Sequence, residues 1–541
     1  MSRSSLGSIF SLRMAPLVGS VCAALTILLV TQGSPDGAGQ IAVIFFVALA
    51  ILGVYDLLQT EHSILRNYPI LGHLRFLLED IRPEIRQYFF EDETEGYPFS
   101  RNKRAVIYQR AKNNLDKRPF GTQLNVYEEG FEWLSHSIAP ETVGSHDFRV
   151  RVGGPQCRRP YDASLFNISA MSFGALSANA LLALNAGAKD GGFAHNTGEG
   201  GLSPYHQIHG GDLIWEIGSG YFSCRTPDGR FDPESFARDA RIDQVKMIEI
   251  KLSQGAKPGH GGLLPGTKVS DEIARIRGVP AGVDCVSPAA HSAFSTPLEL
   301  IRFVQSLREL SEGKPVGFKL CIGRPGEFFA ICKAMLETGI LPDFITVDGK
   351  EGGTGSAPLE FMDHIGMPMR EGLAFVHHTL TGIGLRENIR IAASGKIATG
   401  FDIARASALG ADWCYSARGF MFALGCIQSL KCHTDRCPTG VATQDPARAR
   451  ALVPALKAER VRNYHRSTMI ALAELTAAAG VAHPRDLQAR DFYWRASENQ
   501  IVTLEQLYPP PVPGAFLTGD VDDRLARAWR ESRADSFRAA G

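Results

Sequence analysis

The sequence predicts an α/β fold, a (β/α)8 TIM barrel that follows a membrane-spanning pair of helices. Two observations favour the barrel. Apolar strand-like runs alternate with helical runs from about residue 163 to about residue 430, which indicates parallel strands joined by crossover helices. That span, roughly 270 residues, is also the usual size of an eight-fold barrel. A doubly wound sheet is the alternative, but no GxGxxG motif stands where a dinucleotide-binding fold would need one.

The amino terminus carries two apolar runs, Met14–Thr31 and Ile41–Tyr55, separated by a short polar break. Each is near the lower end of the ~17–25 residues that a spanning helix needs. Arginines lie before the first run and after the second, so the positive-inside rule puts both ends in the cytoplasm. We therefore predict that residues 1–60 form a two-pass anchor in the inner (cytoplasmic) membrane, with the catalytic region in the cytoplasm. A cleaved signal peptide is the competing interpretation.

Residues 61–160 are predicted to form a helical connector, because helical stretches alternate there with prolines. We expect the barrel at residues 161–440 and a helical region at 441–541, whose Arg-rich tail is a solvated helix or disordered. The chain has 57 basic and 57 acidic residues, so its net charge gives no indication of a nucleic-acid partner. Ten cysteines without framework spacing favour a reducing compartment.

Within the barrel, apolar runs and helical periodicity place individual elements. We expect strands at Leu165–Met171, Val245–Leu252, Val316–Ile322, Phe344–Asp348, Ile389–Ala393 and Trp413–Ser416. Helices are expected at Glu327–Glu337, Arg370–Gly382 and Gly400–Ala408, and after the barrel at Pro446–Leu456 and Ala458–Ala479.

Four glycine-dense segments fall at the carboxyl ends of expected strands, where barrel enzymes carry their chemistry. They are residues 170–175 after the first strand, 196–201 after the second, 257–262 after the third, and 348–355 after a later one. Glycines let backbone amides approach a ligand and form nests for anions. One such loop is usually only a turn. Four at one face of a barrel indicate a large phosphorylated ligand such as a flavin nucleotide.

Three of the ten cysteines fall within twelve positions, with the spacing C-x5-C-x4-C and a proline after the last. Thiolates are soft ligands that select iron–sulfur clusters or zinc. Three thiolates indicate a cluster that lacks one iron corner, or a metal with an outside ligand. The alternative is chance clustering of buried cysteines, which pack as small hydrophobic residues. The residues are Cys426, Cys432 and Cys437.

The segment GCIQSLKCHTDRCPTGVATQDP resembles the 3Fe–4S segment of the glutamate synthase large subunit. The segments MSFGALS, NTGEGG, KPGHGGLLPG and GGTGSAP precede it in the order of the FMN domain of that family. The resemblance covers about residues 100–480 and is nearest to membrane-anchored FMN-binding glutamate synthase family proteins, which hold the synthase domain alone. It implies FMN and a 3Fe–4S cluster as cofactors, with the three cysteines as cluster ligands.

The resemblance also implies roles for individual residues. Lys319 would place a positive charge near the flavin N1–O2 edge, where it favours the reduced ring. A surface or ion-paired lysine is the alternative. Glu199 would couple substrate arrival to amidation, or be a capping or solvated carboxylate. Lys319, Glu199 and Lys257 are the catalytic candidates. The flavin would contact Ala170, Met171, Ser172, Thr197 and Lys319, its phosphate would contact Gly353, Thr354, Gly355, Gly395, Ala417 and Arg418, and 2-oxoglutarate would contact Gln254, Lys257 and Arg277.

The sequence departs from the family pattern at His260, where Glu is common, and at Leu263, where Gln is common. Lys350 and Glu351 stand where His-Asp is common, and residues 393–395 read Ala-Ser-Gly in place of Asp-Gly-Gly. The flavin frame is preserved, but a site built on hydrogen bonds discriminates strongly by them, so the substrate is left open. The amino-terminal cysteine nucleophile of a complete glutamate synthase, its long β-helix domain, and a nicotinamide or FAD domain have no counterpart here.

Three functions follow as hypotheses. The first is reductive amination of a 2-oxo acid, 2-oxoglutarate to glutamate, with ammonia or an amine. Its electrons would come from a partner such as ferredoxin or an NAD(P)H-dependent reductase subunit. The second is amine transfer of the N-methylglutamate synthase type. The third is a membrane redox module with no substrate of its own. A purely structural role would require an empty barrel.

Overall fold

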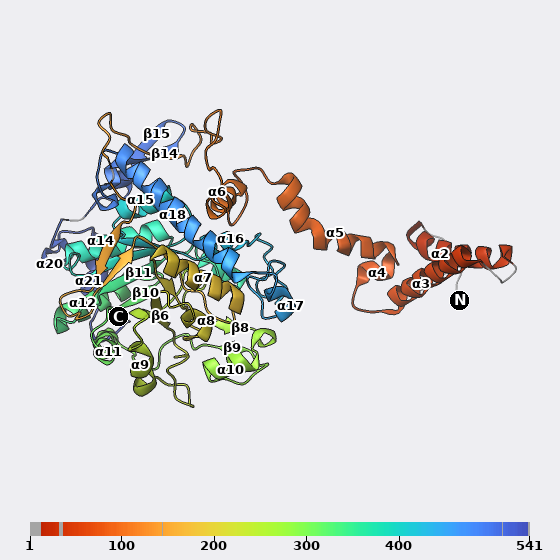
Figure 1. Cartoon of the computed structure of the whole chain (residues 1–541), viewed down its shortest axis with the longest axis horizontal. Helices are drawn as coiled ribbons and strands as arrows, with labels where there is room; N and C mark the ends of the chain where they lie inside the picture. The colour runs from red at the N-terminus through yellow and green to blue at the C-terminus, as the bar shows by residue number, and fades with distance from the viewer. Residues whose placement is uncertain (1–11, 32–35, 143, 511, 539–541) are drawn as a thin grey trace. The chain divides into compact units, whose positions relative to one another are not determined.

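The computed structural model describes residues 12–31, 36–142, 144–510 and 512–538 and divides the chain into two compact units, Met1–Gly96 and Tyr97–Gly541 (Figure 1). The boundary therefore lies inside the predicted 61–160 connector. The first part of that connector belongs with the apolar helices. The rest belongs with the barrel.

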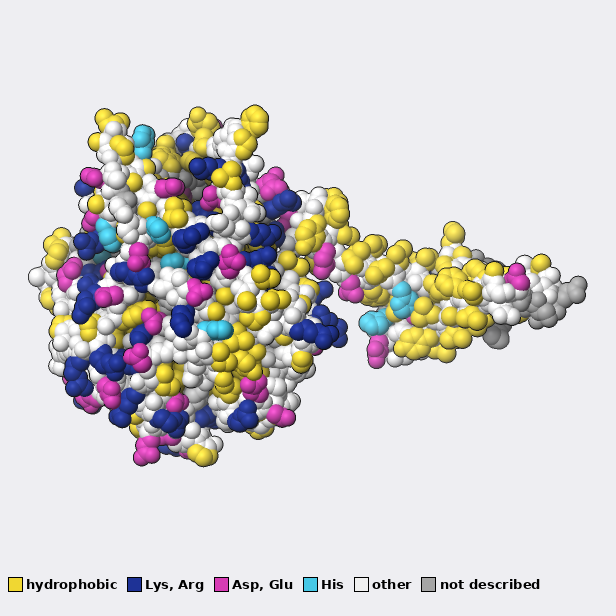
Figure 2. All heavy atoms as spheres, in the orientation of Figure 1, with side chains coloured by type: hydrophobic (Ala, Val, Ile, Leu, Met, Phe, Trp, Pro, Cys, Tyr) yellow, Lys and Arg dark blue, Asp and Glu magenta, His cyan; other side chains and the backbone are white. Residues whose placement is uncertain are grey.

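The amino-terminal unit contains α2 (Ala15–Val30) and α3 (Gly37–Leu58), which pack against each other. Asp36 caps α3 by accepting a hydrogen bond from the Gly39 N–H at 2.7 Å. Leu12–Val30 and Gly37–Leu58 are long and apolar enough to cross a membrane, and the first could equally be a signal sequence. Hydrophobic side chains cover much of the visible surface of this unit (Figure 2). The unit continues with α4 (Ser63–Asn67), α5 (Leu71–Ile85) and a π-helical turn, η2 (Arg86–Phe90).

In the second unit, eight parallel strands close into a barrel, as the sequence predicts. Eight helices follow them in alternation, and the chain from α7 through α15 runs around the sheet (Figure 1). The strands are β4 (Phe166–Ile168), β5 (His195–Asn196), β6 (Leu213–Ile217), β7 (Val245–Lys251), β10 (Val316–Leu320), β11 (Phe344–Asp348), β12 (Arg390–Ser394) and β13 (Trp413–Ser416). The helices are α7 (Ala178–Gly191), α8 (Pro204–Gln207), α9 (Pro233–Ala240), α11 (Pro297–Leu310), α12 (Pro325–Thr338), α14 (Met369–Gly382), α15 (Gly400–Ala408) and α18 (Pro454–Ala478).

Strand β6 is absent from the sequence-based expectation, so the loop at residues 257–262 follows the fourth barrel strand rather than the third. The long segment after β7 forms a small hairpin, β8 (Leu263–Leu264) with β9 (Cys285–Val286), and the short helix α10 (Asp271–Arg277) between them. This segment lies at the carboxyl end of the strands, where a barrel carries its chemistry.

The amino end of the barrel is closed by a second hairpin, β2 (Arg149–Val152) with β3 (Tyr161–Ser164). Val152 and Ala163 of this hairpin are fully buried against side chains at or near the starts of the strands, including Phe344 and Trp413. The hairpin thus plugs one end of the barrel with apolar packing and leaves the other end for the site.

The carboxyl-terminal region is part of the barrel unit rather than a separate domain. After the short α17 (Pro446–Ala449), α18 packs along α7, α15 and α16 (Arg418–Leu424) and completes the ring of helices. The Arg-rich tail forms a helix with Arg524, Arg527 and Arg530 exposed, so the solvated-helix alternative agrees with the described residues and the disordered one does not; the other face of this helix packs on the barrel unit. Phe516 of α20 (Ala515–Thr518) is buried against Phe329, and Trp529 of α21 (Asp523–Glu531) joins them.

Candidate functional site

A pocket opens at the carboxyl ends of the barrel strands. Residues just after β4, at the ends of β10, β11 and β12, and in β13 contribute its walls. Seven of the residues predicted from the sequence line it together: Ala170, Gln254, Lys319, Gly353, Gly395, Ala417 and Arg418. Further lining comes from Phe99, Ser169, Ala256, Asp348, Gly352, Ser394, Lys396, Ile397, Tyr415 and Ser416.

Several polar groups and glycines line one side of this pocket. Tyr415 lines the pocket, and its buried hydroxyl lies near Trp413 and Asn196 of the barrel interior. A side chain at Gly353 would meet the Arg418 guanidinium at 3.1 Å, and Gly395 has a φ of 157°. The arrangement fits a flavin nucleotide whose phosphate lies near Arg418.

Lys319 lines the pocket, and its charge already has partners. Its Nζ is paired with Glu216 Oε2 and lies 3.7 Å from Glu249 Oε1. Burial opposes the charged form, but Glu216, Glu249 and Asp348 outweigh it and raise the pKa of Lys319 above its ordinary value. The ammonium is therefore kept charged at the pocket, as the flavin interpretation requires, and it is also ion-paired.

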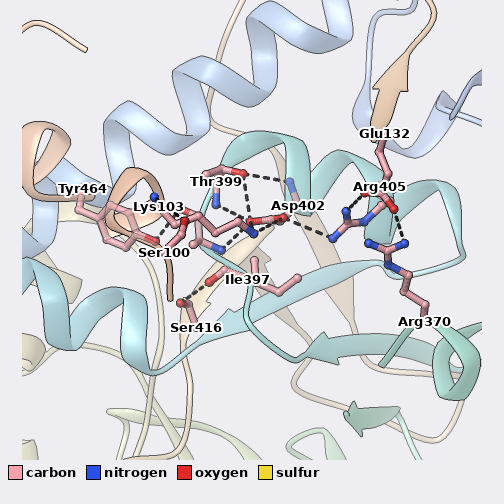
Figure 3. A network of polar contacts seen from close by, with 11 residues as sticks. Ser100, Lys103, Glu132, Arg370, Ile397, Thr399, Asp402, Arg405, Ser416 and Tyr464 are labelled. Carbon is pink, nitrogen blue, oxygen red and sulfur yellow. Dashed lines mark hydrogen bonds and ion pairs between the residues drawn. The ribbon is translucent and has the colours of Figure 1, made fainter. Parts of the chain in front are cut away.

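One wall of the pocket, residues 394–397, is held by a network of polar contacts (Figure 3). Ser416 Oγ donates to the Ile397 carbonyl at 2.6 Å, and the N–H groups of Ala398 and Thr399 donate to Asp402 at 3.1 Å each. Lys103 Nζ lies 3.3 Å from Asp402 Oδ1. Burial disfavours the Asp402 carboxylate, but Lys103 and Arg405 hold its pKa below the usual range. The network fixes this wall to α15.

A short segment at the start of the unit, residues 97–99, contributes to the wall of the pocket and is called the strap below. Phe99 is buried, lines the pocket, and lies under the Arg418 guanidinium at 4.8 Å from the ring centroid. Gln428 of the cysteine segment accepts from the Phe99 N–H at 3.2 Å and donates to the carbonyls of Tyr97 and Phe99 at 3.3 Å. Three hydrogen bonds therefore connect the cysteine segment to the strap at the pocket.

Three cations surround one carboxylate beside the pocket. Glu199 is paired with Lys251. Burial would raise the Glu199 pKa, but Lys251, Arg277 and Lys257 together lower it, so the carboxylate is ionised. The Arg277 guanidinium donates to the Phe173 carbonyl at 2.9 Å and lies 3.4 Å from Ser172 Oγ. Three positive charges against one negative leave this group at a net +2.

The other sequence candidates lie around the pocket rather than in its lining. Met171 is buried next to Ala170, and Ser172 meets Arg277 as described. The Thr197 hydroxyl is committed to backbone, because it donates to the Gly198 carbonyl at 3.0 Å and accepts from the Glu216 N–H at 3.1 Å. Thr354 and Gly355 are exposed. Their loop is near the cysteine segment, since a side chain at Gly355 would meet Cys432 at 3.9 Å.

The three cysteines lie close enough to influence one another. Burial, followed by the charges of Cys432 and Cys437, raises the pKa of Cys426 to about 12. Burial opposes the thiolate of Cys437 as well, but the Ala442 N–H and the Thr439 hydroxyl lower its pKa below the ordinary value. Among the described residues, no three His, Cys, Asp or Glu side chains are grouped so that they could hold a metal ion. The cluster therefore remains a prediction.

The backbone of the cysteine segment is unusual. Gln428, Leu430 and Asp435 have φ values of 58°, 57° and 61°, in the left-handed region that non-glycine residues rarely adopt. Lys268 Nζ is buried against this segment and donates to the carbonyls of Ala175, Cys432 and Ala442 at 3.0–3.4 Å. Strained backbone of this kind persists where its surroundings fix it, often at functional sites.

Besides several residues of the pocket lining such as Phe99, sequence reasoning missed Glu216, Glu249, Lys251 and Gln428. The two glutamates had a readable signal, because LIWEI and MIEIK each carry a carboxylate inside an apolar strand. A buried carboxylate needs a partner. Gln428 had no such signal, since its partners lie about 330 positions earlier in the chain.

Comparison with known proteins agrees with this geometry. Residues 157–482 match the conserved region in glutamate synthase. A glutamate synthase large subunit-like protein of Bacillus subtilis is 39% identical over 85% of this chain and 95% of its own length. The archaeal glutamate synthase [NADPH] of Methanocaldococcus jannaschii is 38% identical over 58% of this chain, which spans only 58% of that relative.

Among solved structures, a mutant flavocytochrome b2 with pyruvate bound aligns over 88% of this chain and 96% of its own, at 12% identity and a TM-score of 0.40, a similarity on which no conclusion rests. The sequence matches are decisive, because they cover more than half of the chain and include the barrel and the cysteine segment. The chain therefore belongs to the glutamate synthase family and contains its conserved synthase region.

Proposed function

We propose that the chain is an FMN-dependent oxidoreductase that reductively aminates 2-oxoglutarate to glutamate. Family membership supports oxidoreductase chemistry. The observation that carries the specific reaction is the +2 group of Glu199, Lys251, Lys257 and Arg277 beside a pocket of flavin-binding character. A dicarboxylate carries two negative charges, so this group matches its charge.

FMN supplies the hydride for such a reaction when it is bound in the pocket. The chain's own residues hold it. Arg418 and the loop at Gly353 would hold its phosphate, Lys319 would place its ammonium near the ring, and Ala170 and Tyr415 would line the ring site. Phe99 excludes water from the open side of the pocket.

Arg277 and Lys257 bind the substrate carboxylates in this proposal. Arginine can grip a carboxylate with two parallel hydrogen bonds, while lysine acts as a point charge. Lys257 Nζ donates to the Ser356 carbonyl at 3.0 Å, which orients it from the far side of the loop. The Glu199 carboxylate pairs with Lys251 and would hold an incoming ammonia in this proposal.

Electrons come from a partner protein, a ferredoxin or an NAD(P)H-dependent reductase subunit. Cys426, Cys432 and Cys437 are the proposed ligands of a 3Fe–4S cluster. Gln428 connects this segment to the strap by hydrogen bonds, so a cluster bound there would lie near the pocket to which it passes electrons. The two apolar helices are proposed to anchor the protein in the cytoplasmic membrane, with the barrel unit on the cytoplasmic side.

The test is anaerobic reduction of purified, flavin-loaded protein, followed by a survey of oxo acid and amine pairs. We expect reoxidation of the flavin by 2-oxoglutarate with ammonia, with glutamate as product. Formation of N-methylglutamate from glutamate and methylamine, with no oxo acid supplied, would favour amine transfer. Reoxidation that is unaffected by any oxo acid would favour a redox module without its own substrate. Protein that releases no flavin on denaturation would falsify all three.

A further inference from the structure

The interior of the barrel contains a polar layer where such barrels normally hold branched apolar side chains. Glu216 on β6 and Glu249 on β7 are register partners, so their side chains stand next to each other. Lys319 on β10 reaches both. All three side chains are at least nine-tenths buried.

The charges of this layer do not balance. Two carboxylates and one ammonium leave a net charge of −1 if all three are ionised. Among the further groups whose charge reaches this layer, Asp348 on β11 is negative and is itself matched by Arg418, and Asn196, Thr346 and Tyr415 are neutral. An uncompensated buried charge is costly, so the layer favours binding of one proton.

The geometry singles out Glu249 as the group that takes this proton. Glu216 is in direct contact with the Lys319 ammonium, whereas Glu249 is 3.7 Å away and completely buried. Two hydrogen bonds favour the ionised form of Glu249, from Asn196 to Oε1 at 2.8 Å and from Thr346 Oγ1 to Oε2 at 2.6 Å, but they do not offset its burial and its neighbour Glu216. Burial, opposed by Lys319 and assisted by Glu216, raises the pKa of Glu249 to about 7.

We propose that Glu249 is a proton-binding site for the pocket, which takes up one proton from solvent when negative charge develops there and releases it when that charge leaves. Lys319 links the two places, because it lines the pocket and also contacts both carboxylates. Negative charge in the pocket attracts the Lys319 ammonium, so this ammonium stabilises ionised Glu249 less. Glu249 then binds a proton, which removes its uncompensated charge. The inference rests on the proposed flavin, which is the source of that negative charge.

At Glu249 the only bond that forms or breaks is O–H. A carboxylate oxygen of Glu249 would accept a proton from solvent when FMN bound in the pocket is reduced by the donor protein, and would release it when the FMN is oxidised again. Tyr415 lines the pocket and is close enough to Glu249 and Glu216 for their charges, after burial, to raise its pKa.

The first arm of the test uses the full-length protein freed of flavin, so it does not depend on the proposed function. A carboxyl group whose pKa is raised in the folded state binds more protons folded than unfolded. It therefore lowers the free energy of unfolding as the pH rises between the unfolded value and about 7. We expect the wild type to show this loss, Glu249→Gln to lack it, and surface Glu309→Gln to retain it. Thr346→Val, which removes a hydrogen bond to the ionised form, should extend the loss to higher pH. Identical pH profiles for the wild type and Glu249→Gln would overturn the inference.

The second arm counts protons with an indicator dye while flavin-loaded protein is reduced by two electrons at about pH 8, where an unperturbed Glu249 would be ionised. We expect about one more proton per flavin in the wild type and in Glu309→Gln than in Glu249→Gln. Equal counts, with the first arm as expected, would show that Glu249 binds a proton without responding to the pocket, and would overturn the inference. If no flavin can be loaded at all, the proposed function fails instead.

Discussion

At the scale of single residues, Arg277 is the side chain that most directly tests the substrate site. Its guanidinium donates to the Phe173 carbonyl, lies over the Phe222 ring at 5.0 Å from the centroid, and lowers the Glu199 pKa. We expect Arg277→Lys to weaken 2-oxoglutarate binding by about 10- to 100-fold, since a charged hydrogen bond contributes about 1.5–3 kcal/mol. Isothermal titration of flavin-loaded protein measures the change.

Arg225 provides a matched control for that substitution. Its guanidinium lies over the same ring, at 5.6 Å, but does not belong to the Glu199 group. Arg225→Lys should leave 2-oxoglutarate binding unchanged. Equal losses in the two variants would mean that packing on Phe222, and not the charge beside Glu199, governs the affinity.

The three cysteines make a prediction that does not depend on turnover. If they bind a 3Fe–4S cluster, the purified protein contains about three iron atoms per chain and absorbs visible light beyond the flavin spectrum. We expect Cys426→Ser, Cys432→Ser and Cys437→Ser each to lower the iron content strongly. Cys332→Ser, at a buried cysteine of α12, should keep it. Iron that persists in all three variants would mean that the ligands lie elsewhere.

Residue identities near the pocket were predictable only where a motif carried them. Gly353 stands in the GGTGSAP motif, and Gly395 and Arg418 were assigned by their position in the family resemblance; the structure brings all three to one pocket. An ion-paired Lys319 was one of the alternatives, but its partners were not predictable, because the two carboxylates come from β6 and β7 and no sequence rule aligns those strands with β10. The register of the barrel creates the polar layer.

At the scale of elements, the strap over the pocket depends on one glutamine. Gln428→Ala removes three hydrogen bonds to Tyr97 and Phe99, and net contributions of about 0.5–1.5 kcal/mol each would loosen Phe99 over the pocket. We expect FMN to dissociate about tenfold faster, as followed by flavin fluorescence after dilution. Gln123→Ala, in an exposed loop, should have no effect. An unchanged rate in Gln428→Ala would mean that Phe99 is held by packing alone.

The carboxyl-terminal helices offer a stability prediction. Phe516 is buried on Phe329, next to Trp529, and a side chain at Gly382 would meet it at 2.5 Å. Removing a buried phenyl ring costs about 3–5 kcal/mol. We expect Phe516→Ala to lower the thermal midpoint by several degrees, whereas Leu517→Ala, at a 59% exposed neighbour, should leave it unchanged. Equal midpoints would show that the tail does not stabilise the barrel.

Elements with strong periodicity were predictable, and short ones were not. The ranges of β11, β13 and α15 agree with the expectation from the sequence to the residue. Strand β6 was missed because it has only five residues, contains the charged Glu216, and is flanked by glycines and turn residues. The ring-closing role of α18 was missed because the cysteine segment separates it from β13. Such an insertion interrupts the alternation of strand-like and helical runs, so the sequence pattern does not reveal the last βα unit of the barrel.

At the scale of the whole molecule, the division between the two units makes the last prediction. The polar barrel unit begins at Tyr97 and contains the whole pocket, the +2 group and the cysteine segment. The preceding unit contains the two helices that could span a membrane. A chain that starts at Tyr97 should therefore be soluble without detergent and retain FMN in a ratio near that of the full chain, while the full chain sediments with membranes. Mass spectrometry of the membrane-bound protein should find the first apolar helix intact. Its loss would identify that helix as a signal sequence, and a shortened chain that still sediments would place the membrane contact on the barrel unit.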